Sequence, residues 1–190
     1  MEKLNIDKTK TALVVIDLQK GIASQPSKPY SAHEVIANAA KLVNTFRKNE
    51  MPVFLVHVIT TKETMLNVIS DESFSRPTAP SPDWAEFVPE IAPTSNDIVI
   101  TKKQWGAFYG TDLELQLRRR GMDTIVLCGI STDFGVESTA RFAYEYGFQQ
   151  IFSEDAMTSR SGEQHNAAFN FIFRRMGRVR KTDEILEALQ

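Results

Sequence analysis

The chain of 190 residues carries a formal net charge of −2 and has a pI near 6, so neither nucleic acid nor an anionic membrane is favoured as a partner. Its length suits one well-buried core, so we expect a single domain over residues 1–190, and its only cysteine, Cys128, excludes an internal disulfide and a cysteine-based zinc site. Residues 1–10 do not resemble a signal peptide and the apolar run after them is too short to span a bilayer, so we expect a cytoplasmic protein.

The first part of the chain predicts two strands separated by a helix. Thr11 to Leu18 is a continuous apolar run rich in β-branched residues, which is typical of a strand covered on both faces. Asp17 lies near the end of this run, although a buried strand does not usually hold a carboxylate. Residues 33–48 repeat apolar side chains at helical spacing, and Val53 to Ile59 is the second predicted strand.

Residues 60–95 have no regular apolar pattern and contain five prolines. The sequence therefore predicts a long loop, with a short helix as its only regular element. A loop of this length inside a compact domain is typically a lid or a contact with a partner. Arg76 is its candidate clamp for a substrate carboxylate.

The second part of the chain alternates strands with helices. Turn residues, a capping box at Thr111–Glu114 and apolar periodicity set the bounds of these elements. The predicted strands are Asp97–Thr101, Thr124–Ile130, Gln150–Glu154 and Arg178–Arg180, and the predicted helices run from Thr111 to Gly121, from Gly135 to Gly147, from Ser161 to Met176 and from Thr182 onward. Such alternation predicts an α/β fold with three α-β-α layers and a mainly parallel, roughly six-stranded Rossmann-like sheet.

Three polar or glycine-rich features follow predicted strands. Asp17 follows the first strand, Lys102 and Lys103 follow the third, and the turn from Gly129 to Gly135 follows the fourth. The carboxyl ends of parallel strands meet at one edge of the sheet, where such folds bind ligands. A carboxylate and an ammonium in a partly dry crevice can move protons. The ordinary alternatives are a strand-end carboxylate, a solvated lysine and a turn whose glycines serve only its geometry.

Three segments, in chain order, carry a resemblance to a known family. The segments are Val14–Gln19, which holds Asp17, then Ile100–Phe108, which holds Lys102, and Gly129–Ala140. Together they resemble the isochorismatase-like hydrolases, also called cysteine hydrolases. The resemblance covers most of the chain and implies that Asp17 and Lys102 are catalytic. The family's lysine stands six residues before a phenylalanine, which selects Lys102 over Lys103.

The chain departs from the family at the nucleophile. The amidohydrolase members have a cysteine two residues before the Glu of the Val-Glu-Ser-Thr segment, and here Gly135 occupies that position. A glycine cannot attack a carbonyl carbon. Cys128 lies seven residues earlier within a strand, where a thiol usually acts as a small apolar filler.

The chain also resembles the isochorismatases proper, which have a glycine at the position of the amidohydrolases' cysteine. The resemblance then implies hydrolysis of the vinyl ether of an isochorismate-like substrate, with Asp17 as general acid, Lys102 as its electrostatic partner and Gly135 in place of the thiol. It also implies a cis peptide bond between Ile130 and Ser131. Two alternatives remain open: a catalytically silent member that binds a metabolite or a partner, and an amidohydrolase that uses activated water.

The resemblance also points to the walls of the pocket. Trp105, Phe108 and Phe134 are candidate aromatic lining, with core or subunit-contact roles as the alternative. The remaining expected substrate-binding residues are Gln19, Ile130 and Ser131. For Asp133, which follows them, we expect an outward-facing helix cap.

We expect no metal and no other cofactor, because His33, His57 and His165 are too scattered for a metal site. His57 lies in an apolar strand and is interpreted as a core histidine with satisfied hydrogen bonds. The expected partners are a small-molecule substrate and further copies of the chain, since family members are commonly homo-oligomers.

Overall fold

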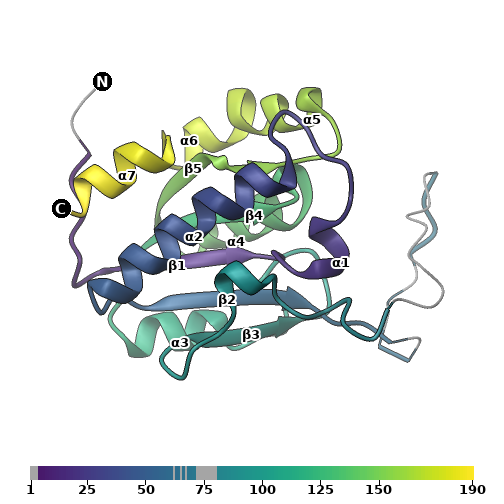
Figure 1. Ribbon diagram of the computed structural model, residues 1–190, viewed down its shortest axis with the longest axis horizontal. Helices are drawn as coiled ribbons and strands as arrows, with labels where there is room; N and C mark the ends of the chain where they lie inside the picture. The colour runs from purple at the N-terminus through teal and green to yellow at the C-terminus, as the bar shows by residue number, and fades with distance from the viewer. Residues whose placement is uncertain (1–3, 62, 65, 67, 72–80) are drawn as a thin grey trace.

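The computed structural model describes residues 4–61, 63–64, 66, 68–71 and 81–190. Arg76, the candidate clamp, lies outside the described residues. The fold is built on a six-stranded sheet, all parallel, in the order β3-β2-β1-β4-β5-β6 (Figure 1). The strands are β1 (Thr11–Ile16), β2 (Val53–Val58), β3 (Ile98–Lys102), β4 (Thr124–Ile130), β5 (Gln149–Thr158) and β6 (Arg178–Arg180). The predicted α/β class is confirmed.

Helices cover both faces of the sheet and complete three layers (Figure 1). On one face α2 (Ala32–Lys48) packs against alternate side chains of β1, such as Leu13 and Val15, and α7 (Thr182–Ala188) packs against α2 and β5 in the same core. On the other face α3 (Leu113–Arg119), α4 (Glu137–Glu145) and the π-helical segment η3 (Ala168–Phe173) pack against the intervening ones. The remaining helical segments are α1 (Lys20–Ala23), η1 (Pro89–Ile91), η2 (Thr132–Val136), α5 (Gly162–Ala167) and α6 (Arg174–Met176). The apolar run of β1 is therefore explained by two covered faces.

Several boundaries differ from those the sequence predicts. β5 continues four residues past Glu154, to Thr158, and the helix expected after Gly135 begins earlier, with the π-helical turn η2. The helix expected from Ser161 to Met176 comprises α5, η3 and α6. The capping box predicted at Thr111 is not formed: α3 begins at Leu113, and the Thr111 hydroxyl donates to the Ala107 carbonyl instead.

No helix in the described part of the chain has the length and apolar character needed to cross a lipid bilayer. The carboxyl ends of β1, β3 and β4 lie at one edge of the sheet, close to α1 (Figure 1). This edge is where the candidate site is found.

Candidate active site

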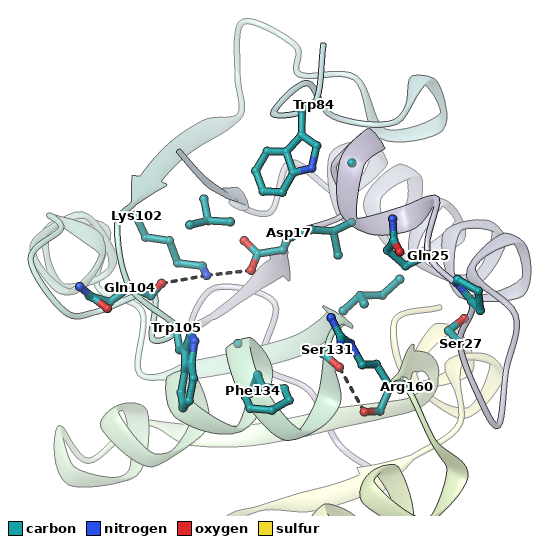
Figure 2. A pocket seen from close by; sticks show the side chains of 17 residues that line it. Asp17, Gln25, Ser27, Trp84, Lys102, Gln104, Trp105, Ser131, Phe134 and Arg160 are labelled. Atoms are coloured by element: carbon teal, nitrogen blue, oxygen red, sulfur yellow. Dashed lines mark hydrogen bonds and ion pairs between the residues drawn. The ribbon is translucent and has the colours of Figure 1, made fainter. Parts of the chain in front are cut away.

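Asp17 and Lys102 meet at the edge of the sheet although their strands are not neighbours. Asp17 follows β1 with a positive φ of 51°, and Lys102 is the last residue of β3, on the far side of β2. Lys102 Nζ lies 2.7 Å from Asp17 Oδ2 and donates to the Gln104 carbonyl at 3.0 Å (Figure 2). Their side chains are only 2% (Lys102) and 6% (Asp17) exposed. Each charge would be costly to bury alone, so the two are held as a buried ion pair.

Gly135 lies directly against this pair. A Cβ atom on Gly135 would stand 3.1 Å from both Asp17 Oδ2 and Ile16 Cγ2. The Gly135 carbonyl accepts from the Thr139 hydroxyl at 2.7 Å, and the same hydroxyl oxygen accepts from the Ala107 amide at 3.0 Å. The buried Thr139 side chain thereby fixes the position of Gly135 relative to the segment that follows Lys102.

A cavity of about 310 Å³ opens onto the ion pair, a size within the usual range for a small-molecule site. Figure 2 shows Asp17 and Lys102 facing its interior between Trp84 on one side and Phe134 on the other. Of the residues that the sequence assigned to the site, those that line the cavity are Asp17, Lys102, Trp105, Ile130, Ser131, Phe134 and Gly135. The Trp105 and Phe134 rings meet edge to face at 4.9 Å.

Gln19 and Phe108 are not part of this lining. Gln19 is fully buried; its side-chain amide donates to the Val58 and Trp84 carbonyls, and its Oε1 accepts from the Val58 amide. Phe108 packs against the rings of Tyr146 and Phe148 in the core. Neither position supports the expected contact with substrate: Gln19 ties β2 to the segment that carries Trp84, and Phe108 belongs to the core.

Trp84 forms part of the wall that sequence reasoning missed. A Cβ atom on Gly21 would stand only 1.9 Å from the Trp84 ring, so the ring takes the place of a side chain at Gly21. The Gly21 amide donates to the Trp84 carbonyl at 3.0 Å, which fixes the two segments together. The one signal of this role in the sequence is an aromatic residue standing in a proline-rich loop.

Asp133 has a different role from the one expected. It does not turn outward as a helix cap: its Oδ1 accepts from the hydroxyls of Ser131, at 2.8 Å, and of Ser159. Both serines line the cavity, and the peptide bond between Ile130 and Ser131 is cis, as the resemblance implied. Asp133 therefore orients two hydroxyl groups in the cavity wall.

Other lining residues were also missed. Ser159 and Arg160 follow β5 and therefore lie at the ligand-binding edge of the sheet. The sequence did not point to them because it predicts that this strand ends at Glu154. Gln25, in the loop after α1, gave no signal in the sequence.

The thiol of Cys128 is fully buried in β4 and is not part of the cavity lining. Burial raises its pKa to about 12, so it is held as a neutral thiol. In the described part of the chain, no three His, Cys, Asp or Glu side chains gather closely enough to hold a metal ion. His57 makes two contacts, with the Ala85 carbonyl and the Thr101 hydroxyl, and stacks on Phe87.

Comparison with known proteins decides the family. A model of the isochorismatase domain matches residues 11–184. The uncharacterized isochorismatase family protein YwoC of Bacillus subtilis (strain 168) is 52% identical over 192 residues, covering 100% of both chains. The chain belongs to the isochorismatase family. The cavity that holds the buried Asp17–Lys102 pair is therefore the candidate site of an isochorismatase-family chain.

Two further isochorismatase relatives place the chain within the family. The solved structure of an isochorismatase family protein from Burkholderia thailandensis superposes with a TM-score of 0.92 at 41% identity, covering 97% of each chain. A protein named "Probable isochorismatase" from Pseudomonas chlororaphis is 29% identical over 184 residues, covering 96% of this chain and 87% of that one. The fold and the family are shared across nearly the whole chain.

Proposed function

We propose that the protein is a hydrolase of a small metabolite that works without a thiol nucleophile, with Asp17 as general acid. The observation that carries the proposal is the buried Asp17–Lys102 ion pair, which faces the cavity beside Gly135. Gly135 offers no nucleophile, and the thiol of Cys128 is buried away from the cavity. A reaction catalysed by an acid and water needs no thiol and is consistent with these groups.

Hydrolysis of a vinyl ether fits this set of groups. The Asp17 carboxylate of the resting ion pair first takes up a proton from water as the substrate binds. Asp17 then gives this proton to the methylene carbon of the substrate, and the adjacent carbon becomes an oxocarbenium ion. Water adds to that carbon to give a hemiketal, and one proton of the water returns to Asp17. The bond between the hemiketal carbon and the bridging oxygen then breaks, and this oxygen stays on the ring and takes the proton of the hemiketal hydroxyl. The products are an alcohol and pyruvate. The Lys102 ammonium stabilises the carboxylate that exists between the two proton transfers.

Two facts support this version over others. A relative of 29% identity is named "Probable isochorismatase". The cavity of about 310 Å³ is lined by aromatic side chains and a few polar groups, which suits a small cyclic molecule.

The test is to supply isochorismate to the purified protein and follow pyruvate release. We expect turnover by the wild type and a loss of about 10²- to 10⁴-fold in kcat for Asp17→Asn, which keeps the shape of the side chain and removes its acid. Asp123→Asn is the matched control, because Asp123 is exposed just before β4. No turnover by the wild type, or full turnover by Asp17→Asn, would overturn this version.

A thiol placed at Gly135 reports on the geometry without any substrate. The variant Gly135→Cys in a Cys128→Ala background puts sulfur beside Asp17 and the Lys102 ammonium. We expect iodoacetamide to alkylate it quickly under native conditions because the ammonium favours the thiolate. The wild type, whose buried thiol is the only one, is expected to stay unlabelled until it unfolds. Labelling of Gly135→Cys at the rate of the wild type would mean that the cavity and the pair do not reach this position.

A further inference from the structure

His165 is a buried imidazole that does not line the cavity but contacts the turn that does. It lies on α5 with no exposed surface, and its Nδ1 is 2.9 Å from the Thr132 hydroxyl oxygen. Thr132 is also fully buried and is the first residue of η2, whose fourth residue is Gly135. The rings of Tyr30 and Phe169 pack against the imidazole at centroid distances of 5.9 and 4.7 Å. The ring therefore has a fixed place behind the catalytic turn.

The other ring nitrogen faces a carboxylate. His165 Nε2 lies 3.5 Å from Glu154 Oε1, which also accepts from the Tyr30 hydroxyl at 2.9 Å, while Lys181 Nζ contacts Glu154 Oε2. Burial alone would raise the pKa of Glu154, but its contacts with His165, Lys181 and Tyr30 outweigh burial and lower the pKa to about 2. Glu154 is therefore ionised at neutral pH, and an ionised carboxylate can only accept hydrogen bonds.

The position of Glu154 selects the tautomer of the imidazole. A proton on Nε2 faces the carboxylate oxygens, whereas a lone pair there would face negative charge. With its proton on Nε2, the ring presents a lone pair at Nδ1, and the Thr132 hydroxyl donates to it. This is the arrangement by which a carboxylate orients a histidine that in turn orients a third group.

We propose that His165 is a positioning residue: through Thr132 it fixes the turn that holds Gly135 and the Ser131 wall against Asp17. The proposal rests on the function proposed above only in that the turn it fixes is taken to be catalytic. Glu154 acts one step further back, by keeping the proton of His165 on Nε2. Neither side chain touches the cavity, so their effect passes through the backbone of η2.

The tautomer is measured directly by the ¹⁵N shifts of the imidazole nitrogens. Three histidines are present, and His165→Asn assigns the signal of His165. We expect a proton on Nε2 and none on Nδ1 in the wild type, with the Nε2 preference reduced in Glu154→Gln. A wild-type ring protonated at Nδ1, or one unaffected by Glu154→Gln, would overturn the assignment of the tautomer to Glu154.

The effect on the site is measured with the Gly135→Cys reporter in the Cys128→Ala background. Adding Thr132→Val keeps the side-chain shape and removes the hydroxyl. We expect alkylation to slow by up to about 100-fold, which is the rate loss typical when a reacting group is misplaced by about 1 Å. We expect Thr132→Ser to restore the alkylation rate. The matched control is Thr182→Val, which removes another fully buried hydroxyl, bonded to Asp155 and Ser153 away from the cavity.

Equal slowing by Thr182→Val would mean that the loss is general destabilisation, and an unchanged rate in Thr132→Val would overturn the positioning role. A reporter thiol that does not react in any variant would contradict the site geometry itself, and the NMR measurement would then decide the tautomer. Neither experiment needs turnover. Failure of isochorismate hydrolysis with a Thr132-dependent thiol rate would overturn the proposed reaction and leave this inference standing.

Discussion

Gly129 stands opposite Ile16 in the pairing of β4 with β1, immediately before Asp17. Its φ is +126°, and a Cβ atom there would lie 2.0 Å from the Ile16 carbonyl oxygen. The backbone of β1 cannot move away because β2 pairs with its other edge. Glycine is therefore required where the two strands approach the site, for steric and conformational reasons together.

We expect Gly129→Ala to cost at least about 3 kcal/mol of unfolding free energy, because the strain falls on two central strands. The measurement is urea unfolding followed by circular dichroism. Gly110→Ala is the control: Gly110 also has a positive φ, +66°, but nothing lies within 4 Å of its Cβ position. That variant should lose only about 1 kcal/mol. Equal losses would show that the close approach to Ile16 adds little to the cost of the positive φ.

The site residues that the sequence predicts best are charged side chains that stand in otherwise apolar segments. Asp17 and Lys102 are charges at the ends of apolar strands, and the sequence places both correctly at the edge of the sheet. Gln19 was assigned by resemblance alone, and its hydrogen bonds to the backbone of Val58 depend on the pairing of β1 with β2. The inward orientation of Asp133 was not predicted, because one of its two partners, Ser159, lies 26 residues away in sequence.

Among the elements, β5 departs most from its predicted bounds. Glu154 and Asp155 interrupt its apolar pattern, so the strand was predicted to end there. Partners from the start of α7 stabilise both carboxylates. Asp155 accepts from the amide and the hydroxyl of Thr182, the first residue of α7, and Glu154 pairs with Lys181, the residue before it. Such partners cannot be predicted from local periodicity, because they come from a segment 27 residues further along the chain.

Glu154 joins β5 to α5 and to the start of α7, and its pKa predicts how the protein responds to acid. Its folded pKa of about 2 is below the ordinary value of 4.5, so its contribution to stability is complete above about pH 4.5 and is lost as the pH falls toward 2. We expect Glu154→Gln to be less stable than the wild type by roughly 1–3 kcal/mol at pH 7.

This difference in unfolding free energy should shrink steadily between pH 4.5 and pH 2. In that range the wild type loses the stabilisation from the ionised Glu154 carboxylate, which the variant lacks at every pH. Urea midpoints measured at intervals across the range check it. A gap between the two proteins that stays constant down to pH 2 would show that Glu154 is not held as a carboxylate by Lys181, Tyr30 and His165.

For the whole molecule, the alternation of strands and helices was enough to predict the three layers and the parallel sheet. The order of the strands was not predicted, because alternation alone does not say on which side of β1 each later strand is added. The chain places β2 and β3 on one side and β4, β5 and β6 on the other. The direction in which successive strands are added to the sheet therefore reverses beside β1. The cavity lies at this point, as expected for open α/β sheets.

Assembly into a homo-oligomer remains a prediction. Several large apolar side chains are exposed, among them Tyr109, Leu115, Phe142, Tyr144 and Tyr146. Of these, the Phe142 and Tyr146 rings stack on each other, and an exposed apolar patch commonly marks a contact between proteins. Sedimentation velocity should give a mass that is a multiple of 21.4 kDa. A monomer at micromolar concentration would contradict the prediction.

The two charges of the site are unequally supported by the sheet. Asp17 follows the central strand β1, whereas Lys102 ends β3, which has a neighbouring strand on only one side. An edge strand opens locally more readily than a central one. Transient opening of β3 is therefore expected to move the Lys102 ammonium away while the Asp17 carboxylate stays in place. We therefore expect heating to abolish the proposed hydrolysis at a lower temperature than the one at which the whole protein unfolds. Amide hydrogen exchange in residues 98–102 should increase over the same range of temperature as this loss of activity.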